Sequence, residues 1–113
     1  MKKTEMLKKN YEFKNVLTKG KFYREKEIEI FILKNNKKRN FLGIAIGTKN
    51  GKAFQRNKAK RLIREAYKNL EEKIINGYSI VVLLKKDIDI NDMKYIDIIN
   101  EMENTFKKAN IIS

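Results

Sequence analysis

The sequence predicts a single α/β domain, an α+β sandwich in which three helices pack on a small mixed sheet of about four strands. Segments of helical periodicity alternate with segments of strand periodicity along 113 residues, the length of one domain. No repeat, linker or low-complexity stretch divides residues 1–113 into two units. Residues 78–84 form a continuous apolar run, typical of a central strand that is buried on both faces and parallel to an earlier strand. The expected order of elements is αβββαβα.

The first helix is expected after a basic segment, residues 1–9, that is predicted to be flexible. Asn10 can cap a short helix that runs to about Lys19 and stops at Gly20, a residue suited to the turn after a helix. Three apolar side chains share one face of this helix, at positions i, i+3 and i+4: Phe13, Val16 and Leu17.

Three strands are expected next. Residues 20–24 turn into a long strand over 26–34, before which an extra short strand is expected, and a further strand follows over 41–48. The side chains of the middle strand alternate between two faces, with Ile28, Ile30 and Ile32 on one and Glu29, Phe31 and Leu33 on the other. One face of this strand is therefore core, and the other carries an aromatic ring.

A basic helix is expected after the loop 49–52, running to about Asn76 and ending at Gly77. Residues 54–68 hold six basic side chains and one acidic, a net charge of +5, and such self-repulsion indicates an anionic partner. Its apolar side is predicted to contain Ala59, Leu62, Ile63, Ala66, Leu70 and Ile74. Its cationic side is predicted to contain Asn57, Lys60, Arg61, Arg64 and Lys68.

A last helix is expected after an acidic connection, with Asn91 as its cap. One face of this helix is apolar: Tyr95, Ile98, Ile99, Met102 and Phe106. Residues 86–104 carry six acids and two bases, so the positive charge of the chain belongs to the other residues.

Composition limits the classes of function. The chain has 27 basic and 14 acidic residues, a net charge of +13 and a pI near 9.9, which is typical of proteins that bind nucleic acids or anionic surfaces. No apolar run approaches the ~20 residues of a membrane span, and the N-terminus lacks the apolar stretch of a signal peptide, so no membrane contact and a cytoplasmic location are expected. The absence of cysteine excludes disulfides and thiolate metal sites.

The basic helix has a second interpretation, a solvated amphipathic face, because a Lys-rich, Asn-rich and Ile-rich composition can arise without selection for RNA binding. Arginine is scarcer, and three of the five arginines lie on this helix: Arg56, Arg61 and Arg64. Planar guanidinium groups suit phosphate oxygens better than ammonium groups do. The arginine distribution favours nucleic acid as the partner.

The segment Gly51–Tyr67 resembles the arginine-rich signature of the bacterial ribonuclease P protein subunit. In that family an Arg-Asn-Arg/Lys triplet opens the helix, as Arg56-Asn57-Lys58 does here, and Lys60-Arg61 and Arg64 match the Lys-Arg pair and further Arg that follow. The similarity extends to the first helix, through Leu7–Asn10, Phe13 and Gly20, and to Leu42–Ile46 with Lys49. After residue 84 only the hydrophobic pattern matches.

The resemblance implies a small αβ protein that binds the catalytic RNA of ribonuclease P and the single-stranded 5′ leader of precursor tRNA. Endonucleolytic removal of the leader is carried out by the RNA with Mg²⁺, which the RNA mainly holds, so no catalytic residue and no metal site are expected in the protein. The family also implies a left-handed crossover through the signature helix, whereas right-handed crossovers occur in ~98% of cases.

The resemblance also assigns two sets of binding residues. The set expected to bind the catalytic RNA is Lys49, Lys52, Arg56, Asn57, Lys58, Lys60, Arg61, Arg64 and Lys68. The set expected to form a leader-binding cleft between the first helix and the sheet is Phe13, Leu17 and Phe31, where Leu17 departs from a position that is often Phe. The competing interpretation of both phenylalanines is ordinary core. Exposed rings and a basic groove would hold unpaired RNA without sequence preference.

Two other functions fit parts of the sequence. A protein-borne nuclease site would need carboxylates around Mg²⁺, since the chain has no His and no Cys, and residues 87–92 are the one acidic cluster that invites it. That cluster lacks the Gly and distal Glu of a calcium loop, and Asn91 and Asp92 are explained by capping of a helix. A ribosomal or architectural RNA-binding protein without an associated enzyme would show the same charge pattern.

Overall fold

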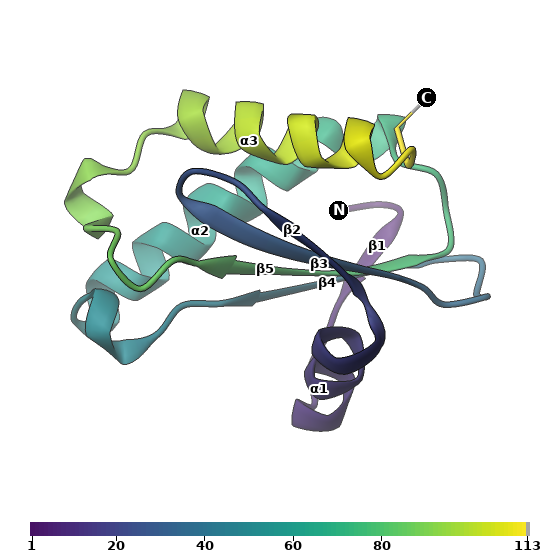
Figure 1. Ribbon diagram of the computed structural model, residues 1–113, viewed down its shortest axis with the longest axis horizontal. Helices are drawn as coiled ribbons and strands as arrows, with labels where there is room; N and C mark the ends of the chain where they lie inside the picture. The colour runs from purple at the N-terminus through teal and green to yellow at the C-terminus, as the bar shows by residue number, and fades with distance from the viewer. Residues whose placement is uncertain (113) are drawn as a thin grey trace.

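A five-stranded mixed sheet forms the centre of the computed structural model, which describes residues 1–112 (Figure 1). The strand order is β1-β4-β5-β3-β2, with parallel pairs β1–β4 and β4–β5 and antiparallel pairs β5–β3 and β3–β2. The elements are β1 (Thr4–Met6), α1 (Asn10–Lys19), β2 (Lys21–Arg24), β3 (Ile28–Lys34), β4 (Asn40–Ala45), α2 (Ala53–Leu70), β5 (Tyr78–Leu84) and α3 (Tyr95–Lys108). The predicted mixed sheet with three helices is confirmed.

The fifth strand comes from the segment 1–9, which the sequence predicts to be flexible, and this prediction is wrong for β1. Here β1 pairs with β4, and the Thr4 hydroxyl shares a buried 2.7 Å hydrogen bond with the Tyr67 hydroxyl. The backbone N–H groups of Lys2 and Lys3 both donate to the Glu71 carboxylate, at 3.2 Å. A three-residue strand has too few positions to show alternation, and the side-chain partners of this segment, Tyr67 and Glu71, lie more than 60 residues away.

The central βαβ unit is β4–α2–β5. The two strands are parallel, and α2, which connects them, lies above the sheet in Figure 1. In the same view β5 lies nearer the viewer than β4. The crossover from β4 through α2 to β5 is therefore left-handed. The handedness implied by the family resemblance therefore holds against the general preference. The predicted central strand over 78–84 is confirmed with the same bounds, parallel to β4.

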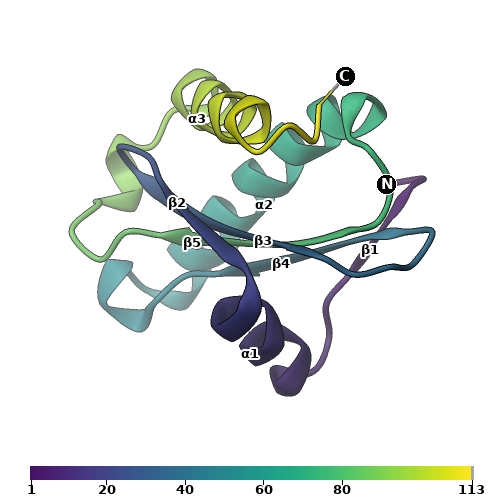
Figure 2. The same ribbon diagram turned by 45° about the vertical axis from the view of Figure 1, so that its right-hand side comes forward.

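The two faces of the sheet are covered unequally. Helices α2 and α3 lie on one face and α1 lies on the other (Figures 1 and 2). Alternate strand residues point to the two-helix face and form the core with these helices; those that are fully buried are Ile28, Ile30, Leu42, Ile80 and Val82. Helix α1 is shorter than the sheet is wide, so part of the opposite face stays open.

Two expected helix boundaries differ from the observed ones. Helix α2 ends at Leu70 rather than near Asn76, because a 3₁₀ turn over Glu71–Lys73 follows, in which Glu71 is held by the N-terminal backbone. Helix α3 begins at Tyr95, and Asn91 does not cap it. Instead the Asn91 N–H donates to the Asp89 carboxylate, at 2.9 Å, inside a separate 3₁₀ turn over 90–92.

Helix α2 contacts the core through a slightly different face from the predicted one. Ala59, Ile63, Ala66 and Leu70 are buried as expected, but Leu62 is only half-buried and Tyr67 is fully buried in its place. The Tyr67 ring packs edge-on against Phe106 of α3, with 6.3 Å between centroids. Burial raises the pKa of Tyr67 to about 12, so its hydroxyl stays protonated and available to Thr4.

Candidate RNA-binding surfaces

A stripe of polar and cationic side chains runs along the outer side of α2, away from the sheet. Successive residues on a helix are about 100° apart, so positions i, i+4, i+7 and i+11 lie in one row. The exposed members of this row are Asn57, Arg61, Arg64 and Lys68. We call these four residues the α2 stripe. Lys49, Lys52 and Lys58 are also exposed, in the loop before α2 and beside the stripe.

Two of the residues predicted to bind the catalytic RNA, Arg56 and Lys60, are half-buried. Arg56 is half-buried, and its Nη1 donates to the Gly51 carbonyl at 2.7 Å, so it also fixes the loop before the helix. Lys60 is half-buried on the flank. The start of α2 is held by a second contact, from the Lys52 N–H to Gln55 Oε1 at 2.8 Å. The loop and the first turn of the helix are thereby tied together.

The cations of this helix have no intramolecular counter-ion within the described residues 1–112. The ion pairs there are Lys3–Glu72, Arg24–Glu29, Arg39–Glu5, Lys73–Glu103 and Lys108–Glu25. Acidic residues elsewhere are thus used to balance other cations. The field of α2 remains available for an anion such as an RNA phosphate.

The three predicted leader residues lie on the face of the sheet that α1 covers. A Cβ on Gly43 of β4 would lie 2.6 Å from Phe13 Cε1, so the Phe13 ring rests directly on the backbone of this glycine. Leu17, one turn further along α1, is 38% exposed. Phe31 belongs to the same sheet face, because it pairs with Val81, which in turn pairs with Gly43.

Phe31 and Gly43, on which Phe13 rests, lie two strand spacings of about 4.8 Å apart, with Val81 between them. Phe31 packs against Phe22 of β2, with 5.0 Å between ring centroids, and Phe22 is 44% exposed. Phe22 is not among the residues predicted from the sequence for this surface. The signal that identifies it is the register of the β2–β3 hairpin, which sets Phe22 opposite Phe31. We call Phe13, Leu17, Phe22 and Phe31 the aromatic surface.

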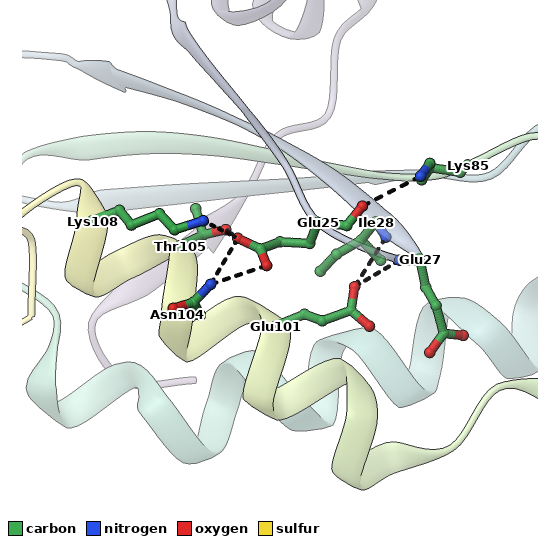
Figure 3. Close-up of polar contacts among 8 residues, drawn as sticks. All are labelled: Glu25, Glu27, Ile28, Lys85, Glu101, Asn104, Thr105 and Lys108. Atoms are coloured by element: carbon green, nitrogen blue, oxygen red, sulfur yellow. Dashed lines mark hydrogen bonds and ion pairs between the residues drawn. The ribbon is translucent and has the colours of Figure 1, made fainter.

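The β2–β3 hairpin that carries these two rings is fastened to α3 at its tip (Figure 3). The Glu101 carboxylate accepts the backbone N–H groups of Glu27 and Ile28, at 2.8 and 3.3 Å. The Glu25 carboxylate accepts the Thr105 hydroxyl at 2.7 Å and pairs with Lys108 at 3.3 Å. The positions of Phe22 and Phe31 therefore depend on the last helix.

The pKa values of the two glutamates at the hairpin tip, Glu25 and Glu27, shift in opposite directions. Burial alone would raise the pKa of Glu25, but hydrogen bonds from Thr105, Asn104 and Lys108 outweigh it and lower the pKa below its ordinary value. Burial raises the pKa of Glu27, and the nearby negative charges of Glu101 and Asp97 raise it further. The folded protein therefore favours the charged form of Glu25 and disfavours the charged form of Glu27.

The contacts of Asp89 and Ile90 in the acidic segment 87–92 stabilise the local fold. Asp89 caps the 3₁₀ turn through the Asn91 N–H, and Ile90 is buried against the core. In the part of the chain that the structure describes, no three Asp or Glu side chains gather in a way that would hold a metal ion. Across the same residues, no helix is both long and apolar enough to cross a membrane.

Comparison with known proteins gives one consistent family. The model of the family Ribonuclease P matches residues 1–110. The ribonuclease P protein component of Clostridium botulinum strain 657 is 38% identical over 110 residues, covering 96% of this chain and 97% of the relative. That of Fusobacterium nucleatum is 39% identical over 108 residues, covering 94% and 97%.

Solved structures agree with the sequences. The ribonuclease P protein of Staphylococcus aureus superposes with a TM-score of 0.82 at 29% identity, covering 96% of this chain and 97% of the other. The Thermotoga maritima protein superposes with a TM-score of 0.82 at 27% identity, covering 92% and 96%. From its sequence and its fold together, this chain belongs to the ribonuclease P protein family.

Proposed function

We propose that this chain acts as the protein subunit of ribonuclease P, which removes the 5′ leader of precursor tRNA to produce the mature 5′ end. Family membership over residues 1–110 supports this role, and the proposed place of action is the cytoplasm. The RNA subunit is the first partner. The second partner is the unpaired leader of the substrate.

The observation that carries the proposal is the row of uncompensated cations on α2. A stripe that follows one helix face over several turns presents charges in a line, and RNA backbones present phosphates in a line. The α2 stripe, together with Lys49, Lys52, Arg56, Lys58 and Lys60, is the proposed contact with the catalytic RNA. Because these side chains lie outside the core, they can bind RNA without a rearrangement of the fold.

The aromatic surface is the proposed contact with the leader. Leaders differ between precursors, so the surface must accept any base, and stacking on exposed rings does this because every base has a π-face. The half-exposed ring of Phe22 supports this role, since it extends the surface that Phe31 begins. Phe13 has a structural part as well, because its ring packs on Gly43.

The protein is proposed to position RNA rather than to cut it. Within the described residues no three carboxylates gather to hold Mg²⁺, and Asp89 caps a turn while Glu101 accepts two backbone N–H groups of the hairpin tip. The metal ions are therefore assigned to the catalytic RNA, where Mg²⁺ supplies charge stabilisation for the phosphodiester cleavage. The cations of the protein reduce the repulsion between two RNA molecules.

Reconstitution tests this function against the alternative of an architectural RNA-binding protein. The protein is mixed with ribonuclease P RNA and precursor tRNA at low Mg²⁺, and leader removal is measured on a gel. We expect cleavage that neither component supports alone. An unrelated basic protein of equal charge is the control, and equal stimulation by that control would refute the assignment.

A further inference from the structure

Helix α1 crosses the strands and leaves sheet exposed on both of its sides. Near its start Phe13 rests on Gly43 of β4, and at its end a Cβ on Gly20 would lie 3.3 Å from the Ile32 carbonyl of β3. The helix thus runs from β4 to β3, across β5. The aromatic surface begins on one side of α1. On the other side the sheet continues with one row of paired residues: Phe41, Ser79 and Leu33.

This second side holds a groove of about 600 Å³, within the range of small-ligand sites. The row Phe41–Ser79–Leu33 forms its floor, α1 forms one wall, and the turn after β3 forms the other. We call it the α1 groove. The side chains that matter for binding are Tyr11, Asn15 and Lys19 from α1, Lys34 from the end of β3, Lys37 from the turn, and Phe41 from the floor.

The charge of the α1 groove is positive. Within residues 1–112, none of its three lysines, Lys19, Lys34 and Lys37, takes part in an ion pair. The single acid among its lining residues is Glu12, whose carboxylate already accepts the backbone N–H groups of Lys9 and Lys8, at 2.9 and 3.1 Å. Those bonds, with smaller help from Lys37 across the groove, lower the pKa of Glu12. The groove is therefore suited to an anion.

The wall that carries Lys37 is held in place before any ligand arrives. Asn35 donates from Nδ2 to the Ser79 hydroxyl at 3.1 Å and accepts the Lys37 N–H on Oδ1 at 2.8 Å. Asn36 has a φ of 57°, a left-handed conformation that Asn tolerates. The Lys37 ammonium then lies 5.1 Å from the centroid of the Phe41 ring. An aromatic face beside a cation on a fixed backbone matches a base and its phosphate.

We propose that the α1 groove binds unpaired nucleotides of the precursor tRNA leader that lie upstream of those on the aromatic surface. The inference rests on the proposed function. Both sites lie on the sheet face that α1 crosses. Helix α2 lies on the opposite face (Figures 1 and 2). Helix α1 alone separates them, a width of about 10 Å that a short run of unpaired nucleotides can cross. Substrate RNA, rather than the RNA on α2, is therefore the occupant.

The test is a double variant, Lys34→Gln with Lys37→Gln, in the enzyme reconstituted with ribonuclease P RNA. The matched control is Lys94→Gln with Lys107→Gln, which removes the same charge from exposed positions outside both sites. Affinity is measured for three RNAs: precursor with a leader of about 5 nucleotides, precursor with one of about 15, and mature tRNA. Thermal unfolding and affinity for the catalytic RNA are measured for each protein.

We expect the double variant to lose about five- to twentyfold in affinity for the long-leader precursor at 0.1 M salt, with a salt slope smaller by about 1.4, as for two lost single-strand phosphate contacts. Short-leader precursor and mature tRNA should bind as they do with wild type, and the control should match wild type throughout. Equal loss for all three RNAs, no loss for any, or reduced affinity for the catalytic RNA would overturn the assignment of the groove.

The same measurements distinguish a failure of the proposed function from a failure of the groove assignment. A wild-type enzyme that fails to prefer either precursor over mature tRNA would refute leader binding altogether, and with it the named occupant of the groove. A wild-type enzyme that shows this preference, combined with a double variant that keeps full affinity for the long leader, would refute the α1 groove alone.

Discussion

The two faces of the sheet do different work. The face under α2 and α3 is closed, and side chains such as Ile30 and Val82 are fully buried there. The face crossed by α1 is partly open, and it leaves Phe22 and Leu17 more than one-third exposed. Apolar burial that stabilises the fold is concentrated on the closed face, whereas the open face keeps apolar area available to a ligand. Substitutions on the two faces should therefore separate stability from RNA binding.

The largest effect is expected from Ile63→Ala on the closed face. Ile63 is fully buried, so its truncation leaves a cavity and should lower the free energy of unfolding by about 2 to 5 kcal/mol. Urea denaturation followed by circular dichroism measures this. Arg61→Ala is the control on the exposed side of the same helix, and it should change stability by less than about 0.5 kcal/mol while weakening binding of the catalytic RNA. If both variants unfold equally easily, the assignment of helix faces is wrong.

Salt dependence provides the next largest effect. If about six cations of α2 and its loop meet phosphates, the logarithm of the RNA association constant should fall with the logarithm of salt concentration at a slope between roughly −4 and −5. Binding should also show little preference for sequence. A filter-binding titration of the free protein at several salt concentrations measures the slope. An affinity that is independent of salt would contradict an electrostatic interface on α2.

Phe13→Ala compares the open face with the closed one directly. If a base stacks on Phe13, its loss should cost about 1 to 3 kcal/mol of affinity for precursor tRNA and nothing for mature tRNA. KM should rise with little change in kcat, because stacking made equally in the ground and transition states is uniform binding.

Stability must be measured alongside, since the Phe13 ring packs on Gly43. Equal loss for precursor and mature tRNA would mean that Phe13 is only part of the core. Phe22→Ala sharpens the test, because Phe22 is more exposed and has less structural role. It should show the same selectivity for precursor with a smaller loss of stability.

The smallest effects concern the hairpin tip and pH. The pKa of Glu25 is lowered in the folded state, so its stabilising contribution is present above its ordinary value of 4.5 and is lost as pH falls through the folded value. Glu25→Gln should therefore destabilise the protein near pH 7, by about 1 kcal/mol or less, and match wild type in acid below that window.

Glu27→Gln should show the opposite sign. The pKa of Glu27 is raised, so protonation of this side chain favours the fold below the ordinary value of 4.5, and that benefit is lost as pH rises through the folded value. The substitution removes the buried charge and should stabilise the protein at neutral pH, with no gain in acid. Urea midpoints across roughly pH 3 to 8 compare both variants with wild type. If the urea midpoints of the two variants changed with pH in the same way, the opposite pKa shifts of Glu25 and Glu27 would be contradicted.

Local patterns predict the closed face well. The apolar run at 78–84 is enough to define β5, because a strand buried on both faces needs apolar residues at every position. The basic and apolar sides of α2 follow from helical spacing alone. Leu62 and Tyr67 are the exceptions: Leu62 is only half-buried, and the buried Tyr67 hydroxyl is paired with Thr4, which lies on a strand too short to leave a pattern.

The open face is less predictable because its sites form between elements. Phe22 contacts Phe31 only through the hairpin register, and that register depends on where the turn falls. The α1 groove joins a helix, a turn and three strands, so its lysines are scattered in sequence. Family resemblance identified Phe13, Leu17 and Phe31 as a set, but their roles toward RNA stay predictions.

The hydrogen bonds between the hairpin tip and α3 affect the order in which parts of the protein can fold. Glu101, Thr105 and Lys108 reach partners that lie 73 to 83 residues earlier in the chain. During translation the hairpin tip is made early, and the N–H groups of Glu27 and Ile28 wait for an acceptor that is made only with α3. The basic helix precedes that acceptor in the chain and therefore leaves the ribosome before it. A nascent chain thus exposes the cations proposed to bind RNA while the hairpin tip still lacks its contacts with α3, inside a particle made largely of RNA.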